Sequence, residues 1–175
     1  MLHNLLQHPL IAPLEEIVRE HRSLLLEGLA SSSKAAVSAL AQTFTGKQLL
    51  ILTSSSQEEE RLLQDLPLFT ERPVLDFPAW ETLPAENIPP SPDSVGARYQ
   101  LLQSLSQSKE PSIVLVSLQA ALQRLLPKTL FLDSLISLSI QQSYPFSELV
   151  HWLERGGYQK KTVVAEKGEF AARGG

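Results

Sequence analysis

Cysteine is absent from this sequence of 175 residues, and its four histidines have no ligand-like spacing. Without cysteine the chain can form no disulfide, can do no thiol chemistry and offers no thiolate to a metal ion. The scattered histidines, His3, His8, His21 and His151, do not replace those ligands. We therefore expect no metal site in this chain.

Long apolar runs are missing as well, and so is a basic segment ahead of an apolar one near residue 1. A membrane-spanning helix needs roughly 18 or more consecutive apolar residues, and no stretch of the sequence approaches that length. We expect a cytoplasmic protein without a membrane partner. Its length and its 43% of hydrophobic residues are sufficient for a buried core.

Positive charge is scarce over most of the chain. Residues 1–152 hold ten Lys and Arg against sixteen Asp and Glu, whereas residues 153–175 hold five against three. Binding to a nucleic-acid backbone depends on clustered cations, so the acidic body argues against that function. The basic C-terminal end is a candidate docking surface, and an ordinary solvated surface is the alternative.

Residues 27–36 resemble a phosphate-binding loop that has lost its functional residues. The functional pattern, G-x-x-x-x-G-K-[ST], uses glycines to wrap the phosphates, Lys to meet the outer phosphates and a hydroxyl to hold Mg²⁺. Gly28 and Lys34 have the required spacing, but Ser33 replaces the second glycine and Ala35 replaces the hydroxyl residue. We predict a vestigial loop that binds no cofactor. A coincidental Gly and Lys in an ordinary strand-turn-helix is the alternative.

Short apolar runs alternate with segments of helical periodicity in the first two thirds of the chain. We predict strands at residues 23–27, 48–53, 73–76 and 112–117, and helices within residues 9–22, 35–44, 57–66, 93–105 and 118–125. This alternation predicts an α/β domain with a parallel sheet. We expect strand 48–53 to be covered on both faces and Arg98 to lie on the outer face of its helix. Asp76, at a strand end, is a candidate for holding Mg²⁺.

Seven of the twelve prolines lie between Pro67 and Pro92, which predicts an ordered or extended loop anchored by Phe77 and Trp80. The composition changes again after Pro127. We therefore divide the chain into residues 1–128, the α/β domain, and residues 129–175, part of a smaller α+β domain. In the second part we predict a strand at 135–140, a helix from Ser147 to the Gly156-Gly157 pair, and a hairpin of residues 161–164 and 169–173.

Two strings of residues, 77–84 and 157–175, resemble the N-terminal region of the bacterial transcription-repair coupling factors, and the similarity covers nearly the whole chain. The resemblance implies a helicase-like domain that has lost ATP hydrolysis, followed by a β-rich domain that docks excinuclease A. These correspond to domains 1a and 2 of excinuclease B. In that family ATP, Mg²⁺, RNA polymerase and double-stranded DNA belong to other regions of a longer parent, an ATP-dependent DNA translocase.

The resemblance also implies which residues dock excinuclease A. Family members carry a basic residue directly after a Gly-Tyr pair and an Arg near the end of the second string. The second is Arg173, whose guanidinium suits bidentate contacts with carboxylates. The first is Gln159, which has no charge, and Lys160 and Lys161 are its candidate substitutes. Alternatively, Arg173 pairs with Glu169 across a strand.

A nucleotide-binding helicase domain like that of excinuclease B is the competing interpretation. That family has an intact phosphate loop and a tyrosine-rich hairpin after its third strand. Here Ser33 and Ala35 interrupt the loop, and residues 77–92 contain one Trp and no Tyr. Both differences favour the coupling-factor family. Mg²⁺-dependent nucleotide binding through Lys34 would favour the competing enzyme.

Overall fold

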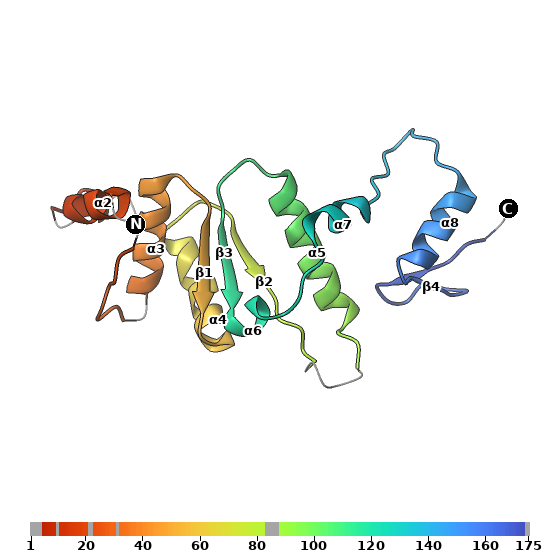
Figure 1. The fold of residues 1–175 in the computed structure, drawn as a ribbon, viewed down its shortest axis with the longest axis horizontal. Helices are drawn as coiled ribbons and strands as arrows, with labels where there is room; N and C mark the ends of the chain where they lie inside the picture. The colour runs from red at the N-terminus through yellow and green to blue at the C-terminus, as the bar shows by residue number, and fades with distance from the viewer. Residues whose placement is uncertain (1–4, 10, 21–22, 31, 83–87, 174–175) are drawn as a thin grey trace. The chain divides into compact units, whose positions relative to one another are not determined.

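The structure is a computed structural model that describes residues 5–9, 11–20, 23–30, 32–82 and 88–173. The chain separates into two compact units (Figure 1). The first unit combines Met1–Ala79 with Gln100–Gln123, and the second combines Trp80–Tyr99 with Arg124–Gly175. The domain limits 1–128 and 129–175 stay a prediction.

Helices and strands alternate through the first unit, as the sequence predicts. In chain order the elements within the described residues are α2 (Ile11–Glu20), α3 (Ser33–Thr45), β1 (Leu49–Thr53), α4 (Ser56–Asp65), the 3-10 helix η1 (Leu66–Leu68), β2 (Val74–Phe77), α5 (Pro92–Gln107), β3 (Ile113–Ser117), α6 (Leu118–Ala121), α7 (Lys128–Asp133), α8 (Phe146–Arg155), β4 (Gln159–Lys160) and β5 (Glu169–Phe170). None of the helices within the described residues combines the length and the apolar character that crossing a bilayer needs.

A three-stranded parallel sheet organises the first unit. Its strand order is β1-β3-β2, with Val114 of β3 in register with Leu50 of β1 and with Leu75 of β2. The predicted α/β class, the parallel sheet and three of the four predicted strands are therefore confirmed.

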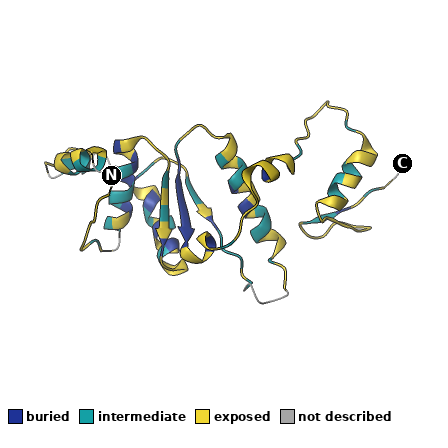
Figure 2. Cartoon of the chain, in the orientation of Figure 1, coloured by how far each residue is buried: buried dark blue, intermediate teal, exposed yellow. Residues whose placement is uncertain are grey.

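Strand β3 is the centre of the core, because it is buried on both faces (Figure 2). Successive side chains of a strand point to opposite faces, so its residues divide between two clusters. The first cluster covers one face and contains Ala35, Ala39, Leu62, Leu66, Phe69, Ile113 and Leu115. The second covers the other face and contains Phe77, Leu101, Val114, Val116 and Ala120.

Helices α3 and α4 begin and end where the sequence provides the necessary residues. The Ser55 hydroxyl accepts a hydrogen bond from the backbone N–H of Glu58 at 3.3 Å and so caps α4. Helix α3 ends at Gly46, whose φ of +60° is a left-handed conformation that favours glycine. Both helices were predicted within two residues of their observed ends. They supply Ala35, Ala39 and Leu62 to the first cluster.

Two predictions about the sheet are wrong. Residues 23–27 form no strand, and Leu24, Leu25 and Leu26 are exposed. An apolar run becomes a strand only when another strand pairs with it, and the run itself cannot specify that partner. Strand β1 lies at an edge of the sheet with Leu50 and Leu52 exposed at 66% and 56%, so it is covered on one face and not on both.

The N-terminal part of α5 belongs to the second unit and shows a further correction. Arg98 is only 1% exposed and its guanidinium lies 4.1 Å from the centre of the Trp80 ring, so it is not on an outer face. Stacking of an Arg on an aromatic ring compensates for part of the cost of burying its charge. Phe77 is buried, as predicted, whereas residues 83–87 of the proline-rich loop lie outside the described residues.

The rest of the second unit contains fewer strands than predicted. Residues 135–140 form no strand, while the predicted helix is present as α8 and is followed by Gly157 with a φ of +84°. Strands β4 and β5 pair in parallel, with Gln159 opposite Glu169, so the predicted hairpin is wrong. The chain between these strands therefore returns to run in the same direction again, and two residues of each strand pair.

Candidate docking pocket and vestigial phosphate loop

The segment predicted as a vestigial phosphate loop forms a turn directly before α3. Gly28 has a φ of +73°, a backbone conformation that favours glycine. The Ser33 hydroxyl donates a hydrogen bond to the carbonyl oxygen of Ala30 at 2.5 Å. Helix α3 starts at Ser33, and the side chain of the preceding Ser32 makes no capping hydrogen bond. The turn therefore brings Ser33 and Lys34 to the start of a helix, as a phosphate loop does.

Lys34 is already paired with a carboxylate of the same unit. Its Nζ lies 2.5 Å from Oε1 of Glu58 in α4. The other carboxylate oxygen of Glu58 accepts hydrogen bonds from the backbone N–H and the hydroxyl of Ser54 at 3.2 and 2.9 Å. The contact with Lys34, together with those from Ser54, lowers the pKa of Glu58 to about 2. Near neutral pH the charge of Lys34 is therefore balanced inside the protein.

Ala35 belongs to the first core cluster and is 0% exposed. In a functional loop the residue at this position directs a hydroxyl at Mg²⁺. Here the position is surrounded by apolar side chains, so the methyl group fits the core and a hydroxyl would lie in apolar surroundings. That this turn is a vestigial phosphate loop, and that it binds no phosphate, both stay predictions.

Two buried polar groups near the carboxyl end of the sheet were not predicted. Glu59 is buried, and its Oε1 has no hydrogen-bond partner among the described residues. Burial, with the nearby charge of Asp76, raises the pKa of Glu59. Thr53, the last residue of β1, is also buried. The positions of Glu59, Leu62 and Leu66 on one face of a helix could have indicated that Glu59 is buried.

Asp76 lies in β2 and pairs in register with Leu115. Among the residues that the structure describes, no group of three His, Asp or Glu side chains is arranged to hold a metal ion. A role of Asp76 in holding Mg²⁺ therefore has no support from neighbouring ligands in this part of the chain.

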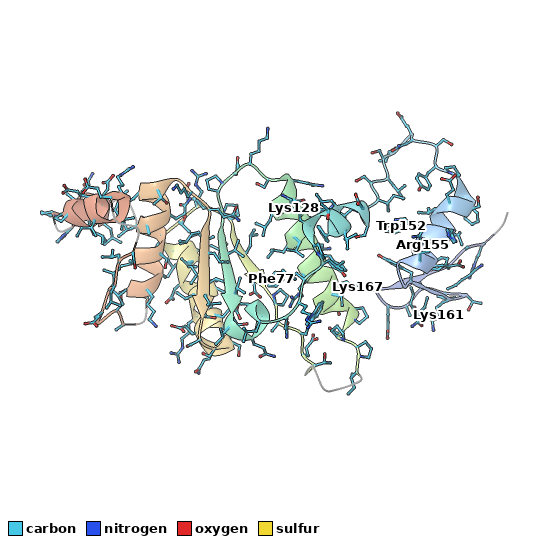
Figure 3. The ribbon with its side chains drawn as sticks, viewed as in Figure 1. Phe77, Lys128, Trp152, Arg155, Lys161 and Lys167 are labelled. Atoms are coloured by element: carbon cyan, nitrogen blue, oxygen red, sulfur yellow. The ribbon has the colours of Figure 1, made fainter. Side chains whose placement is uncertain are left out.

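A basic pocket in the second unit brings together three of the four residues predicted to dock a partner. The pocket has a volume of about 360 Å³, and the residues that line it are Lys160, Lys161, Thr162, Ala172 and Arg173. Gln159, the fourth predicted residue, does not line the pocket. Figure 3 shows Lys161 and Lys167 in the same unit as Trp152 and Arg155 of α8. The side chains that define this pocket all come from the segments around β4 and β5.

Arg173 is positioned by the backbone of the loop between these two strands. Its Nη2 donates a hydrogen bond to the carbonyl oxygen of Thr162 at 3.1 Å. A guanidinium has five N–H donors, so one such bond leaves donors for a ligand. The alternative pairing of Arg173 with Glu169 is not among the ion pairs of the described residues. Glu169 instead lies 3.8 Å from Nζ of Lys161.

Glu169 contacts Lys161 of the pocket, and the sequence did not indicate this role. Its Oε2 accepts hydrogen bonds from the backbone N–H groups of Ala165 and Glu166 at 2.9 and 3.2 Å. These two hydrogen bonds are the main cause of a lowered pKa of Glu169. The carboxylate therefore stays ionised and holds the loop that carries Thr162, the residue that positions Arg173.

Comparisons with known proteins find relatives that are named transcription-repair-coupling factor. No family model matches the chain. It is 28% identical over 156 residues to the transcription-repair-coupling factor of Staphylococcus haemolyticus, a match over 89% of this chain and 13% of the relative. The corresponding protein of Mycobacterium tuberculosis is 31% identical over 133 residues, 73% of this chain and 11% of the relative. That of Staphylococcus aureus is 26% identical over 152 residues, 86% of this chain and 13% of the relative.

The chain thus spans about an eighth of the length of the curated relatives that it matches. The predicted resemblance to the transcription-repair-coupling factors is confirmed. The match covers most of this chain, and so includes residues of both compact units.

Proposed function

We propose that this chain, whose curated relatives are transcription-repair-coupling factors, is a non-catalytic interaction module that recruits excinuclease A. In this role it corresponds to the N-terminal part of a longer coupling factor. The module links a stalled RNA polymerase to nucleotide excision repair by providing the surface on which the repair protein docks. The first unit is the folded scaffold, and the second unit carries the docking surface.

The basic pocket is the observation that carries this proposal. Lys160, Lys161 and Arg173 line one pocket in a chain whose overall net charge is −4. Cations gathered in this way favour an acidic partner, and an Arg held by a backbone carbonyl is well prepared for a carboxylate. The residues that the family resemblance assigns to docking thus occur together in space, apart from Gln159.

The phosphate loop supports the non-catalytic part of the proposal. Lys34 is paired with Glu58, and Ala35 is buried in the core. Neither side chain is prepared to bind the outer phosphates or Mg²⁺ of a nucleotide. In the longer parent, which we propose is an ATP-dependent DNA translocase that displaces RNA polymerase, ATP and Mg²⁺ serve other regions. Binding of double-stranded DNA and of RNA polymerase belongs to those regions as well.

The second candidate function is a nucleotide-binding helicase domain like that of excinuclease B. It requires Lys34 to exchange Glu58 for a phosphate and requires another group to replace the missing hydroxyl at residue 35. The geometry of both residues favours the interaction module.

Titration of the 175-residue chain with purified excinuclease A in a calorimeter tests the proposal. We expect saturable binding by the wild type and an affinity at least about tenfold lower for Arg173→Ala, because a directional charged contact is lost. Arg72→Ala is the matched control, because Arg72 is an exposed Arg of the first unit. No binding by the wild type, or equal losses in the two variants, would contradict the proposal.

A further inference from the structure

Two buried polar atoms of the first unit have no hydrogen-bond partner among the residues that the structure describes. They are Oγ1 of Thr53, the last residue of β1, and Oε1 of Glu59 in α4. Thr53 is 2% exposed and Glu59 is 8% exposed, so bulk solvent does not reach these atoms. A buried polar group that lacks a partner costs the free energy of its lost hydration, so each such group needs an explanation.

Thr53 and Glu59 both face the space between α4 and the sheet. Side chains of a strand alternate between the two faces, so Thr53 lies on the same face as Ile51, which packs against the first core cluster. Glu59 lies three positions before Leu62, the residue of α4 that belongs to that cluster, and so shares its side of the helix. Helix α4 starts at Ser56, directly after β1, which puts its first turn at the carboxyl end of that strand.

Ser117 provides a third polar group at the same place. It ends β3 and pairs in register with Thr53 on the neighbouring strand. Ser117 alternates with Leu115 of the first cluster, so its side chain lies on the same face of the sheet. Its hydroxyl accepts a hydrogen bond from the backbone N–H of Ala120 at 3.4 Å, which leaves its own O–H to donate. Ser117 is also near Glu59, because burial raises the pKa of Glu59 and the backbone and side chain of Ser117 oppose that rise.

The spacing and chemistry of these three groups fit one water molecule. Residues in register on neighbouring strands lie about 4.8 Å apart. A molecule that makes a hydrogen bond of about 2.8 Å to each of two atoms spans up to about 5.6 Å between them. A buried water typically makes about three hydrogen bonds, and Thr53, Glu59 and Ser117 supply three partners. Water donates to a carboxylate and accepts from a hydroxyl, so it can pair with all of them.

We propose that a single water molecule is bound between α4 and the carboxyl end of the sheet, where it bridges Oγ1 of Thr53, Oε1 of Glu59 and the hydroxyl of Ser117. The water ties the ends of β1 and β3 to the first turn of α4. This binding site belongs to the first unit, and it does not depend on whether the second unit docks excinuclease A.

A metal cation fits this site less well than water does. Glu59 lies near the start of α4, and the N-terminal end of a helix carries a partial positive charge that disfavours a cation. A divalent cation takes most of its ligands from several oxygen atoms, usually of carboxylates. The part of the chain that the structure describes has no group of three His, Asp or Glu side chains arranged to hold a metal ion. We therefore take water as the ligand and make a cation an outcome of the test.

Thr53→Val distinguishes a hydrated site from a dry one by the sign of its effect, because valine keeps the shape of threonine and removes the hydroxyl. With a bound water, we expect the equilibrium constant for urea unfolding of the 175-residue chain to rise about 5–30-fold, since the water loses a partner. In a dry site the variant would remove an unpaired hydroxyl, so an unchanged or smaller constant would overturn the proposal. Ser112→Ala is the control for a buried hydroxyl with a partner, since that hydroxyl accepts a hydrogen bond from Nε2 of Gln48 at 3.2 Å.

A double-variant cycle tests whether one water joins the groups. Thr53→Val and Glu59→Leu each remove a partner of the same water, so their effects should not be independent. We expect the equilibrium constant for unfolding of the double variant to be at least about threefold smaller than additive effects give. Thr53→Val with Ser112→Ala is the matched pair, because Ser112 directly precedes β3, at the other end of the sheet. Additive effects in both pairs would overturn a shared water.

A crystal structure of the 175-residue chain, at a resolution that shows ordered waters, observes the ligand directly. We expect a density peak within about 3.2 Å of Oγ1 of Thr53, Oε1 of Glu59 and Oγ of Ser117. No peak, or a direct hydrogen bond between Thr53 and Glu59 in its place, would overturn the proposal. A peak from crystals grown with Mg²⁺ that lay only about 2.0–2.1 Å from these oxygens would overturn the choice of water.

Discussion

Lys34 and Arg173 are both cations that a family pattern assigns to an anionic ligand, but their contacts in the structure differ. Lys34 stands at the start of a core helix and is paired with Glu58 at 2.5 Å. Arg173 lines a pocket and donates to the backbone carbonyl of Thr162 at 3.1 Å. Lys34 is thus neutralised by a carboxylate of the same unit, whereas the hydrogen bond that Arg173 donates goes to an uncharged carbonyl oxygen.

This difference follows from where each cation lies. Lys34 comes from the unit with two core clusters, where α3 and α4 both pack on the sheet and bring Glu58 within reach. The pocket lies beside two short strands, β4 and β5, whose one buried aromatic residue is Phe170. A cation with the spacing of a known motif can therefore be paired within the protein, and this depends on which carboxylate the fold places beside it.

Reversing the charge of Arg173 and of Lys34, in separate variants, should give the largest difference in affinity for excinuclease A. We expect Arg173→Glu to reduce the affinity for excinuclease A about 100-fold or more, because a like charge would then face the acidic partner. Lys34→Glu should leave docking unchanged and lower the melting temperature, because the new carboxylate faces Glu58. Calorimetric titration and thermal unfolding of both variants measure these effects. Loss of docking in Lys34→Glu at a temperature where it is folded would show that the two cations do not differ in this way.

Restoration of the phosphate-loop hydroxyl should destabilise the protein without creating an enzyme. Ala35→Thr adds volume and a hydroxyl at a site that is 0% exposed, which should lower the free energy of unfolding by about 1–3 kcal/mol. The double variant Ser33→Gly with Ala35→Thr should show no ATP hydrolysis. Urea unfolding and phosphate release are the measurements, with Ser38→Thr at a half-buried position of the same helix as the control. Hydrolysis by the double variant would refute the inactive-loop interpretation.

The pair between Lys34 and Glu58 should give a modest pH dependence of stability. The pKa of Glu58 is lowered from 4.5 to about 2, so its ionised form stabilises the fold above about pH 4.5. That contribution is lost as the pH falls from 4.5 towards 2. Because both side chains are partly exposed, we expect about 0.5–1 kcal/mol. Unfolding of wild type and Glu58→Gln at pH 3 and pH 6 measures it, and an equal difference at both values would contradict the pairing.

Glu59, the next residue, should show a smaller dependence of the opposite sign. Burial raises its pKa, so the folded state binds a proton more tightly than the unfolded chain does. Stability should therefore decrease as the pH rises from 4.5 through the raised pKa of the folded state. Glu59→Gln cannot ionise and should remove this decrease. The difference between variant and wild type in urea unfolding, followed from pH 4 to pH 8, should grow with pH. A flat difference would show that Glu59 does not titrate in that range.

Local patterns in the sequence were sufficient to predict the helices and strands that the first unit contains. Strand β3 was evident because β-branched residues follow Pro111, and α4 was evident because Ser55 precedes a turn rich in Glu. The prediction of a strand at residues 23–27 was wrong, because a strand forms only by pairing with another strand that is distant in the sequence. The environment of Arg98 was missed for a related reason, since the ring of Trp80 lies far from it in sequence.

The candidate site was predictable in part. Lys160, Lys161 and Arg173 were chosen from the family resemblance, and the structure places them in one pocket. The roles of Glu58 and Glu169 could not be predicted, because a carboxylate that neutralises a cation is defined by distance and not by sequence spacing. Glu58 lies 24 positions after Lys34, and the hydrogen bonds of Glu169 depend on a loop with irregular backbone.

Calorimetric titration of the 175-residue chain with ATP and Mg²⁺, beside Lys34→Ala, is the sharpest test of whether the phosphate loop is inactive. Lys34 is balanced by Glu58 and the hydroxyl that would hold Mg²⁺ is absent, so we predict no saturable heat for either protein. Saturable binding by the wild type that disappears in Lys34→Ala would contradict an inactive loop. The ion pair would then open for a nucleotide, and the loop between Gly28 and Ala35 would be a working site.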